Sequence, residues 1–173
     1  MLEKRNFYIN GKWVPPSKPN DFEVINPSNE EPFAIISLGG ATDTNSAVEA
    51  AKKAFVKWKE TSKEERINLL EKLLKIYKKR FNELAEAQSM EMGAPIDYAI
   101  SAQTASGQSH LEDFILRLKN FKFDEHFDSK SNNHISYEPI GVCGFITPWN
   151  WPCLLYTSPS PRDRSLSRMP SSA

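Results

Sequence analysis

The first 40 residues alternate short apolar stretches with turn-forming residues, a pattern that predicts strands. Residues 7–14, FYINGKWV, place β-forming side chains on both sides of Asn10-Gly11, the strongest short signal for a β-hairpin. Two more apolar stretches, FEVINP and PFAIISL, are separated by the turn residues at 26–29. We therefore expect a hairpin followed by two edge or surface strands.

The next 50 residues carry apolar side chains at helical spacing. A first helix is predicted over 43–59, capped by Thr42 or Thr44, with one apolar stripe made by Val48, Ala51, Phe55 and Trp58. A second helix is predicted over 62–92. It starts at a capping box of Ser62 and Glu65 and stops before Gly93, and its stripe contains Ile67, Leu70, Leu74, Tyr77, Phe81 and Leu84.

A third helix is predicted over 97–119, and it is rich in small residues. Gly107 lies in its middle, where glycine costs up to about 1 kcal/mol relative to alanine unless another backbone needs the space. We expect this helix to pack closely against a neighbour.

The periodicity changes after residue 132. HISYEPI at 134–140 is β-rich, and GVCGFITP at 141–148 is apolar without alternation, as in a parallel strand buried on both faces. Pro148 ends this strand and leaves Trp149, Asn150 and Trp151 beyond its carboxyl end, where open α/β sheets bind ligands. The pattern predicts an α/β fold, although packing alone is the simpler interpretation of the two tryptophans.

Composition changes sharply after Cys153. The 18 residues from Tyr156 to Ala173 include six serines, three prolines and three arginines but no lysine, so this segment cannot build a core. We divide the chain into a domain at 1–153 and a disordered tail at 154–173. An artefactual origin of the tail is the leading hypothesis, and a phosphorylatable Arg/Ser segment is the alternative.

Charge and hydropathy exclude several function classes. The chain has 22 basic and 22 acidic residues and therefore no net charge, and no basic stripe suggests nucleic-acid binding. Its amino terminus has no apolar leader, and no window approaches the run of about 18 apolar residues that spans a bilayer. We expect a cytoplasmic protein without membrane contact.

The residue types that carry chemistry are sparse. Cys143 and Cys153 have no histidine or basic cluster nearby in sequence, and Cys143 is interpreted as a small buried hydrophobe. His110, His126 and His134 fall on different predicted elements and share no helical face, so we expect no metal site. The glycines form neither a GxGxxG nor a Walker pattern.

At EPIGVCGFITPWNWP, residues 138–152, the sequence closely resembles a signature stretch of the NAD(P)-dependent aldehyde dehydrogenase superfamily. The resemblance also covers YINGKWV, VINPSNEEPFAIISLG, two helical segments and MEMGAPI, and thus nearly all of residues 7–152. It implies the amino-terminal part of that fold: the hairpin, the helices, HISYEPI as an oligomerisation strand, and GVCGFITP as the first strand of an incomplete Rossmann-like sheet without the glycine fingerprint.

The resemblance also implies a function. Ile146, Thr147, Pro148 and Trp149 would line the NAD or NADP cofactor, and the Asn150 amide would donate to the oxyanion of a cysteine thiohemiacetal. The family oxidises aldehydes to carboxylic acids and forms homo-oligomers. Its nucleophilic cysteine and general-base glutamate match no residue here, so we expect a truncated, inactive piece with exposed apolar faces. The alternative is a non-catalytic helical interaction or regulatory module.

Overall fold

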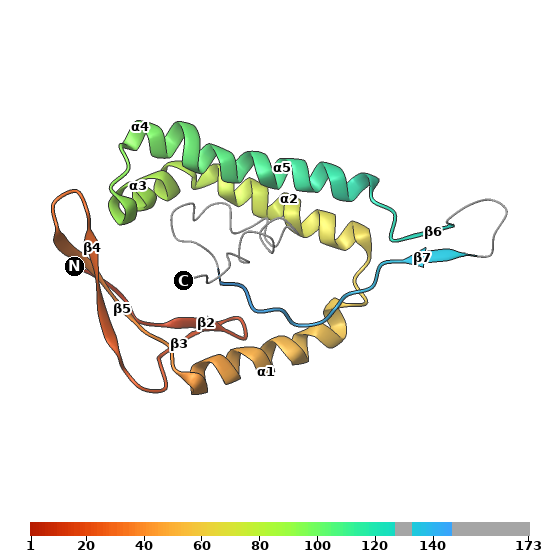
Figure 1. Cartoon of the computed structure of the whole chain (residues 1–173), viewed down its shortest axis with the longest axis horizontal. Helices are drawn as coiled ribbons and strands as arrows, with labels where there is room; N and C mark the ends of the chain where they lie inside the picture. Colours follow the sequence, from red (N-terminus) through yellow and green to blue (C-terminus); the bar gives the residue numbers. More distant parts are fainter. Residues whose placement is uncertain (127–132, 147–173) are drawn as a thin grey trace, which may run out of the picture. The chain divides into compact units, whose positions relative to one another are not determined.

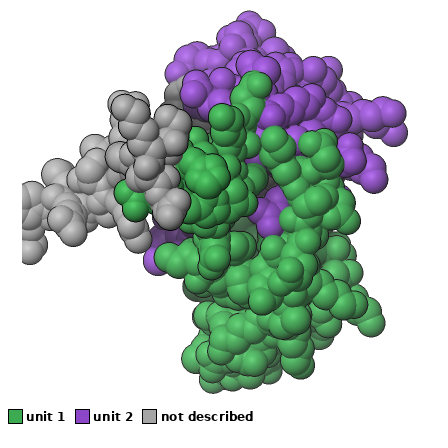
Figure 2. All heavy atoms as spheres, turned by 90° about the vertical axis from the view of Figure 1, so that its right-hand side faces the viewer, with its two compact units in different colours: residues 1–65, 120–143 green, residues 66–119, 144–173 purple. Residues whose placement is uncertain are grey.

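The computed structural model describes residues 1–126 and 133–146 (Figure 1). The chain divides into two compact units, coloured in Figure 2. Unit 1 comprises residues 1–65 and 120–143, and unit 2 comprises 66–119 and 144–173, of which the last described residue is Ile146. Among the described residues, no helix has the length and apolar character needed to cross a membrane.

The predicted hairpin is present in unit 1. Strands β2 (Phe7–Ile9) and β3 (Lys12–Val14) pair antiparallel. Asn10 and Gly11 connect them with φ values of 53° and 74°, the two positive angles that a type I′ turn needs. The hairpin prediction is confirmed. The turn forms at Asn10-Gly11 because Asn and Gly tolerate positive φ angles better than other residues.

A three-stranded sheet forms the rest of the amino-terminal part. Its order is β1 (Leu2–Lys4), β5 (Glu31–Ser37) and β4 (Asp21–Asn26), with β1 parallel and β4 antiparallel to β5. Strand β1 was not predicted. It pairs along β5 and places β5 in the centre of the sheet, so of the two strands expected at an edge or on the surface, β4 lies at an edge and β5 does not.

Helix α1 (Ala41–Trp58) begins one residue after Gly39-Gly40. Neither Thr42 nor Thr44 caps it: the N-cap is Gly40, whose N–H donates to Asp43 Oδ2 over 2.9 Å. A carboxylate at the third helical position can reach this N–H, and here it takes the place of a hydroxyl cap. The predicted apolar stripe is covered only in part, since Trp58 remains 47% exposed.

The second predicted helix is divided in two. Helix α2 (Lys63–Lys79) starts at the predicted capping box, in which Ser62 N–H donates to Glu65 Oε2 (2.7 Å) and Glu65 N–H donates to Ser62 Oγ (3.2 Å). Helix α3 (Phe81–Met92) follows after Arg80, whose φ of −103° and ψ of 18° leave the helical range. The apolar spacing continues across Arg80, so periodicity alone does not reveal this break.

The helix stop at Gly93 is confirmed by its φ of 68°, with its N–H bonded to the carbonyl of Ser89 (2.9 Å). The third helical stretch consists of α4 (Ile96–Tyr98), a π-helical turn η1 (Ala99–Thr104) and α5 (Ala105–Asn120). Ala99 and Thr104 are fully buried, and α3 packs against η1. Small residues therefore do allow a close approach between helices.

The apolar core of unit 2 lies between α2 and α5, which run antiparallel (Figure 1). Ile67, Leu111 and Ile115 are its buried members, surrounded by Leu70, Leu73, Leu74 and Leu118. Salt bridges of 2.6 Å join the same two helices on their exposed side, from Lys119 to Glu71 and from Lys78 to Glu112. Exposed pairs of this kind contribute about 0–1 kcal/mol each, so apolar burial is the main cohesive contribution.

Buried hydrogen bonds join α2 and α3 to η1. The Tyr77 hydroxyl donates to the carbonyl of Thr104 over 2.8 Å, and Gln88 Nε2 donates to Thr104 Oγ1 over 2.8 Å. Because a π-helical turn changes which backbone carbonyls are bonded within the helix, the hydroxyl of Tyr77 can supply a donor to one of them.

The carboxyl-terminal part of unit 1 contains the two-stranded ribbon of β6 (Asp124–His126) and β7 (His134–Ser136). The HISYEPI strand is thus present but short. GVCGFITP is not a strand in its described part: residues 141–146 have no regular structure. A parallel strand needs neighbours for its N–H and C=O groups, and none pairs with this segment among the described residues.

Truncation of Leu111 tests the core of unit 2. Leu111 is 1% exposed, whereas Leu116 on the same helix is 61% exposed. We expect Leu111→Ala to lower the free energy of unfolding by about 2–5 kcal/mol, because it leaves a cavity between α2 and α5. Leu116→Ala is the matched control and should change it by less than about 0.5 kcal/mol. Urea unfolding followed by circular dichroism measures both, and equal effects would contradict this assignment of the core.

Candidate functional site

The site residues predicted from the sequence lie at the boundary of the described chain. Ile146 is described, and its side chain is fully exposed. Thr147, Pro148, Trp149 and Asn150 lie outside the described residues. The assignment of these five residues to cofactor and oxyanion therefore stays a prediction.

The segment leading to Ile146 forms no helix or strand and pairs with no strand among the described residues. Gly141 has a φ of 121°, which residues with a side chain rarely adopt. Cys143 is exposed, with Sγ 3.8 Å from the carbonyl oxygen of Gly141. The expectation of a buried Cys143 is wrong, because the strand that would bury it does not form among the described residues.

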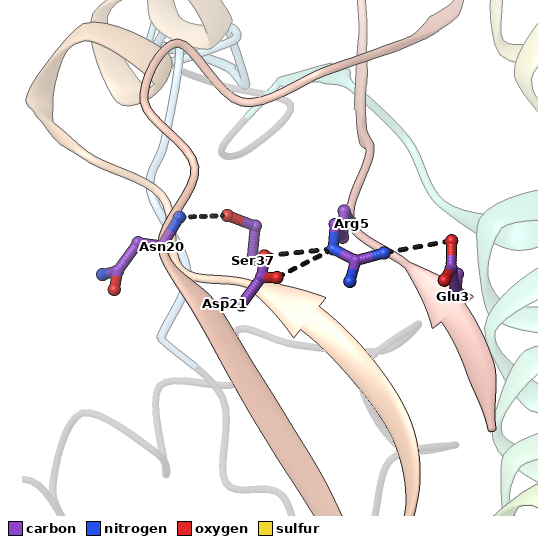
Figure 3. A network of polar contacts seen from close by, with 5 residues as sticks. All are labelled: Glu3, Arg5, Asn20, Asp21 and Ser37. Carbon is purple, nitrogen blue, oxygen red and sulfur yellow. Dashed lines mark hydrogen bonds and ion pairs between the residues drawn. The ribbon is translucent and has the colours of Figure 1, made fainter.

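Charged side chains gather where β1, β5 and β4 meet in unit 1 (Figure 3). Arg5 follows β1, and its Nε lies 3.0 Å and 3.1 Å from the two carboxylate oxygens of Asp21 at the start of β4. Glu3 contacts the same guanidinium over 3.1 Å. The hydrogen bond with Asp21 is the main reason that the pKa of Arg5 is raised, so the arginine stays charged.

This cluster also fixes the end of the central strand. The backbone N–H of Asn20 donates to Ser37 Oγ over 3.0 Å, and Ser37 is buried. Next to the cluster lies a hollow of about 610 Å³ lined by Glu3, Lys4, Arg5, Asn6 and Trp13. Because Arg5 pairs with both Glu3 and Asp21, we interpret the cluster as a structural link between β1 and β4.

A second polar centre surrounds Asp43, which the sequence analysis did not single out. Asp43 Oδ1 accepts from Ser17 N–H (2.8 Å), and Oδ2 accepts from Gly40 N–H (2.9 Å). The bond from Gly40, followed by that from Ser17, lowers the pKa of Asp43. The carboxylate thereby ties the proline-rich loop after β3 to the start of α1. An acidic residue three positions after a glycine pair was the available sequence signal.

No group of three or more His, Cys, Asp and Glu side chains in the described part of the chain is arranged to hold a metal ion. The sequence and the fold of the chain can be compared with those of known proteins. Residues 13–160 match the aldehyde dehydrogenase family.

The chain belongs to the aldehyde dehydrogenase family.

Individual relatives agree with this membership. A 3-succinoylsemialdehyde-pyridine dehydrogenase from a Pseudomonas species is 40% identical over 153 residues, which cover 88% of this chain and 31% of the relative. A crystal structure of an aldehyde dehydrogenase from Bartonella henselae has 53% identity and a TM-score of 0.75, covering 76% of this chain and 28% of that one.

A mutant of aldehyde dehydrogenase C from Pseudomonas syringae, crystallised with NAD⁺ and octanal, has 38% identity and a TM-score of 0.83. The similarity covers 88% of this chain and 31% of that structure. The chain therefore spans about a third of the length of the aldehyde dehydrogenases that it matches, and it corresponds to their amino-terminal part. This confirms both the family and the α/β fold class expected from the sequence.

The family match ends at residue 160, seven residues beyond the boundary predicted after Cys153. Residues 154–160 lie outside the described chain, as does the rest of the predicted tail. The division into a domain at 1–153 and a tail at 154–173 stays a prediction.

The Asp43 contacts predict a pH dependence. Because the folded-state pKa of Asp43 is lowered, its contribution to stability is present above the ordinary Asp pKa of about 3.9 and is lost as the pH falls through the folded-state value. We expect Asp43→Asn to lower Tm and speed amide exchange at Gly40 and Ser17 near neutral pH, with the difference from wild type shrinking in acid. Asp97→Asn, at the first turn of α4, is the control. A difference in Tm that is independent of pH would contradict the role of the charge.

Proposed function

We propose that this chain supplies the amino-terminal part of an NAD(P)-dependent aldehyde dehydrogenase that oxidises an aldehyde to a carboxylic acid. The observation that carries the proposal is the match of residues 13–160 to the aldehyde dehydrogenase family. It is supported by neighbouring structures that contain NAD⁺, including the Pseudomonas syringae enzyme with octanal and an aldehyde dehydrogenase from Mycobacterium tuberculosis.

In this proposal, residues 146–149 bind and orient the cofactor, which accepts a hydride when bound. Ile146 is the only one of the four within the described residues, and its exposed side chain is accessible to such a group. The exposure of Ile146 fits a residue that becomes covered when a ligand or further strands pack against it.

Asn150 is the proposed oxyanion donor. A neutral amide N–H₂ stabilises the negative charge that develops on the aldehyde oxygen after thiolate attack, and it does so without a change of protonation state. Removal of one such donor typically costs about 3–4 kcal/mol of transition-state stabilisation. The flanking Trp149 and Trp151 would hold the amide in place.

The remaining steps need groups that match no residue of this chain. A cysteine thiolate forms the thiohemiacetal, hydride leaves to the cofactor, and a glutamate activates the water that hydrolyses the resulting thioester. The resemblance implies that both groups come from sequence corresponding to later parts of the family. Neither Cys143 nor Cys153 matches the nucleophile.

We further propose a cytoplasmic location and a homo-oligomeric state for the whole protein. The oligomer is supported by the resemblance of HISYEPI to the family's oligomerisation strand, and β7 (His134–Ser136) occupies that stretch. Neither membrane nor nucleic acid has a part in this proposal, because the charge balance and hydropathy favour neither.

A non-catalytic module is the second candidate, and one observation favours it. Helices α2 and α5 have a core of their own, formed by Ile67, Leu111 and Ile115. A helical unit of this kind could bind a partner without any dehydrogenase chemistry. Genomic DNA across the codon for Pro152 separates the two candidates: an open frame into a cysteine-containing catalytic region supports the enzyme, and a stop after Ala173 supports the module.

The first activity test uses the purified 173-residue chain. We expect no aldehyde-dependent formation of NADH or NADPH, because an oxyanion donor without the nucleophile cannot form the covalent intermediate. Absorbance at the NADH wavelength, with octanal as the aldehyde and heat-treated protein as the control, measures this. Turnover that is abolished by Asn150→Ala would show the expectation to be wrong.

The second activity test uses a chimera. Residues 1–152 are joined to the remaining part of the Bartonella henselae relative, whose structure is 53% identical over the matched region. We expect an active enzyme in which Asn150→Ala lowers kcat by about 100- to 1,000-fold. Asn29→Ala, at an exposed turn, is the matched control and should leave kcat unchanged.

Thermal melting of each chimera separates loss of chemistry from loss of folding. A folded chimera that binds NAD⁺ but has unchanged kcat after Asn150→Ala would contradict the assignment of Asn150. A folded chimera with neither NAD⁺ binding nor activity would favour the non-catalytic module.

A further inference from the structure

The ribbon of β6 and β7 brings together two histidines that the sequence analysis treated separately. His126 in β6 is the direct register partner of His134 in β7. Their ring centroids are 5.4 Å apart and their planes are inclined by 51°. Helical spacing does not predict this arrangement. The strand β6 was not predicted, and cross-strand neighbours follow the register of the sheet.

The separation of the rings is compatible with a shared metal ion. An imidazole nitrogen binds a divalent ion at about 2.0–2.1 Å, so two imidazoles on one tetrahedral ion have ring centroids about 5 Å apart. The observed 5.4 Å is close to this value. Rotation about the side-chain bonds alone can close the difference, without a shift of either strand.

Asp124 lies on the same face of the ribbon as the two histidines. Its Oδ1 accepts a hydrogen bond of 2.7 Å from Ser136 Oγ and lies 4.0 Å from His134 Nε2, which is longer than a hydrogen bond. Asp124 therefore places a negative charge beside the two rings, and this charge favours a cation there.

The ribbon is also accessible. All three residues of β6 are exposed, and so is His134. An ion bound here would keep water as its remaining ligands.

We propose that His126 and His134 form a two-histidine clamp for a late first-row divalent metal ion. Imidazole ligands suit Zn²⁺, Ni²⁺ and Cu²⁺. Mg²⁺ and Ca²⁺ prefer oxygen ligands and do not fit a pair of imidazoles. The clamp uses none of the residues proposed for the cofactor and the oxyanion, and it shares His134 with β7, the strand proposed for the oligomer.

The test uses the full 173-residue chain and Ni²⁺ as the only added metal. Both cysteines are first alkylated, because thiolates also bind such ions. Equilibrium dialysis should find one Ni²⁺ per chain near pH 8. His126→Ala and His134→Ala should each weaken binding by about tenfold or more, since each removes one of two ligands. Asp124→Asn should also weaken it, because this variant removes a negative charge beside the two rings.

His110→Ala is the matched control, because His110 lies on α5 and belongs to neither strand of the ribbon. Its affinity for Ni²⁺ should equal that of the wild type. Unchanged affinity in His126→Ala, or an equal loss in His110→Ala, would overturn the proposal.

A measurement on the unmutated chain avoids any effect of the variants on folding. Ni²⁺ is paramagnetic and broadens the NMR signals of nearby nuclei. In a titration, the ring resonances of His126 and His134 should broaden together and before those of His110. Broadening of His110 first, or of only one ribbon histidine, would overturn the proposal.

Discussion

The antiparallel contact between α2 and α5 is the interaction on which unit 2 depends. Ile67 on one helix meets Leu111 and Ile115 on the other, and these are the residues of that unit's apolar core. Leu111 is almost completely buried, so its position fixes how closely the two helices can approach. The exposed salt bridges between the helices add little to this contact, whose geometry is determined by apolar burial.

The same constraint explains why the turn at η1 accepts small and polar residues. Thr104 is fully buried where α3 approaches η1, and it is bonded by Tyr77 and Gln88. A larger residue would separate the helices, while a buried Thr without donors and acceptors nearby would be costly. The packing of these helices and the small-residue pattern thus reflect the same requirement for close approach.

A different constraint governs the segment that leads to the proposed cofactor residues. Its composition is that of a buried parallel strand, yet residues 141–146 have no strand partner among the described residues. Burying the backbone of such a segment without pairing costs about 1–3 kcal/mol for each unsatisfied group, so the segment stays exposed. This is consistent with a chain that spans about a third of the length of the aldehyde dehydrogenases that it matches.

The sequence by itself determined the hairpin, the capping box at Ser62, the helix stop at Gly93 and the family, because each depends on neighbouring residues or on an uninterrupted motif. Tertiary structure decided what depends on distant partners: β1 pairs with β5, α1 is capped through Asp43, and the helix breaks at Arg80. It also decided that Cys143 is exposed and that His126 faces His134. Local propensity cannot predict these features, since a strand's burial, a carboxylate's partner and a cross-strand neighbour are all set by residues far away in the chain.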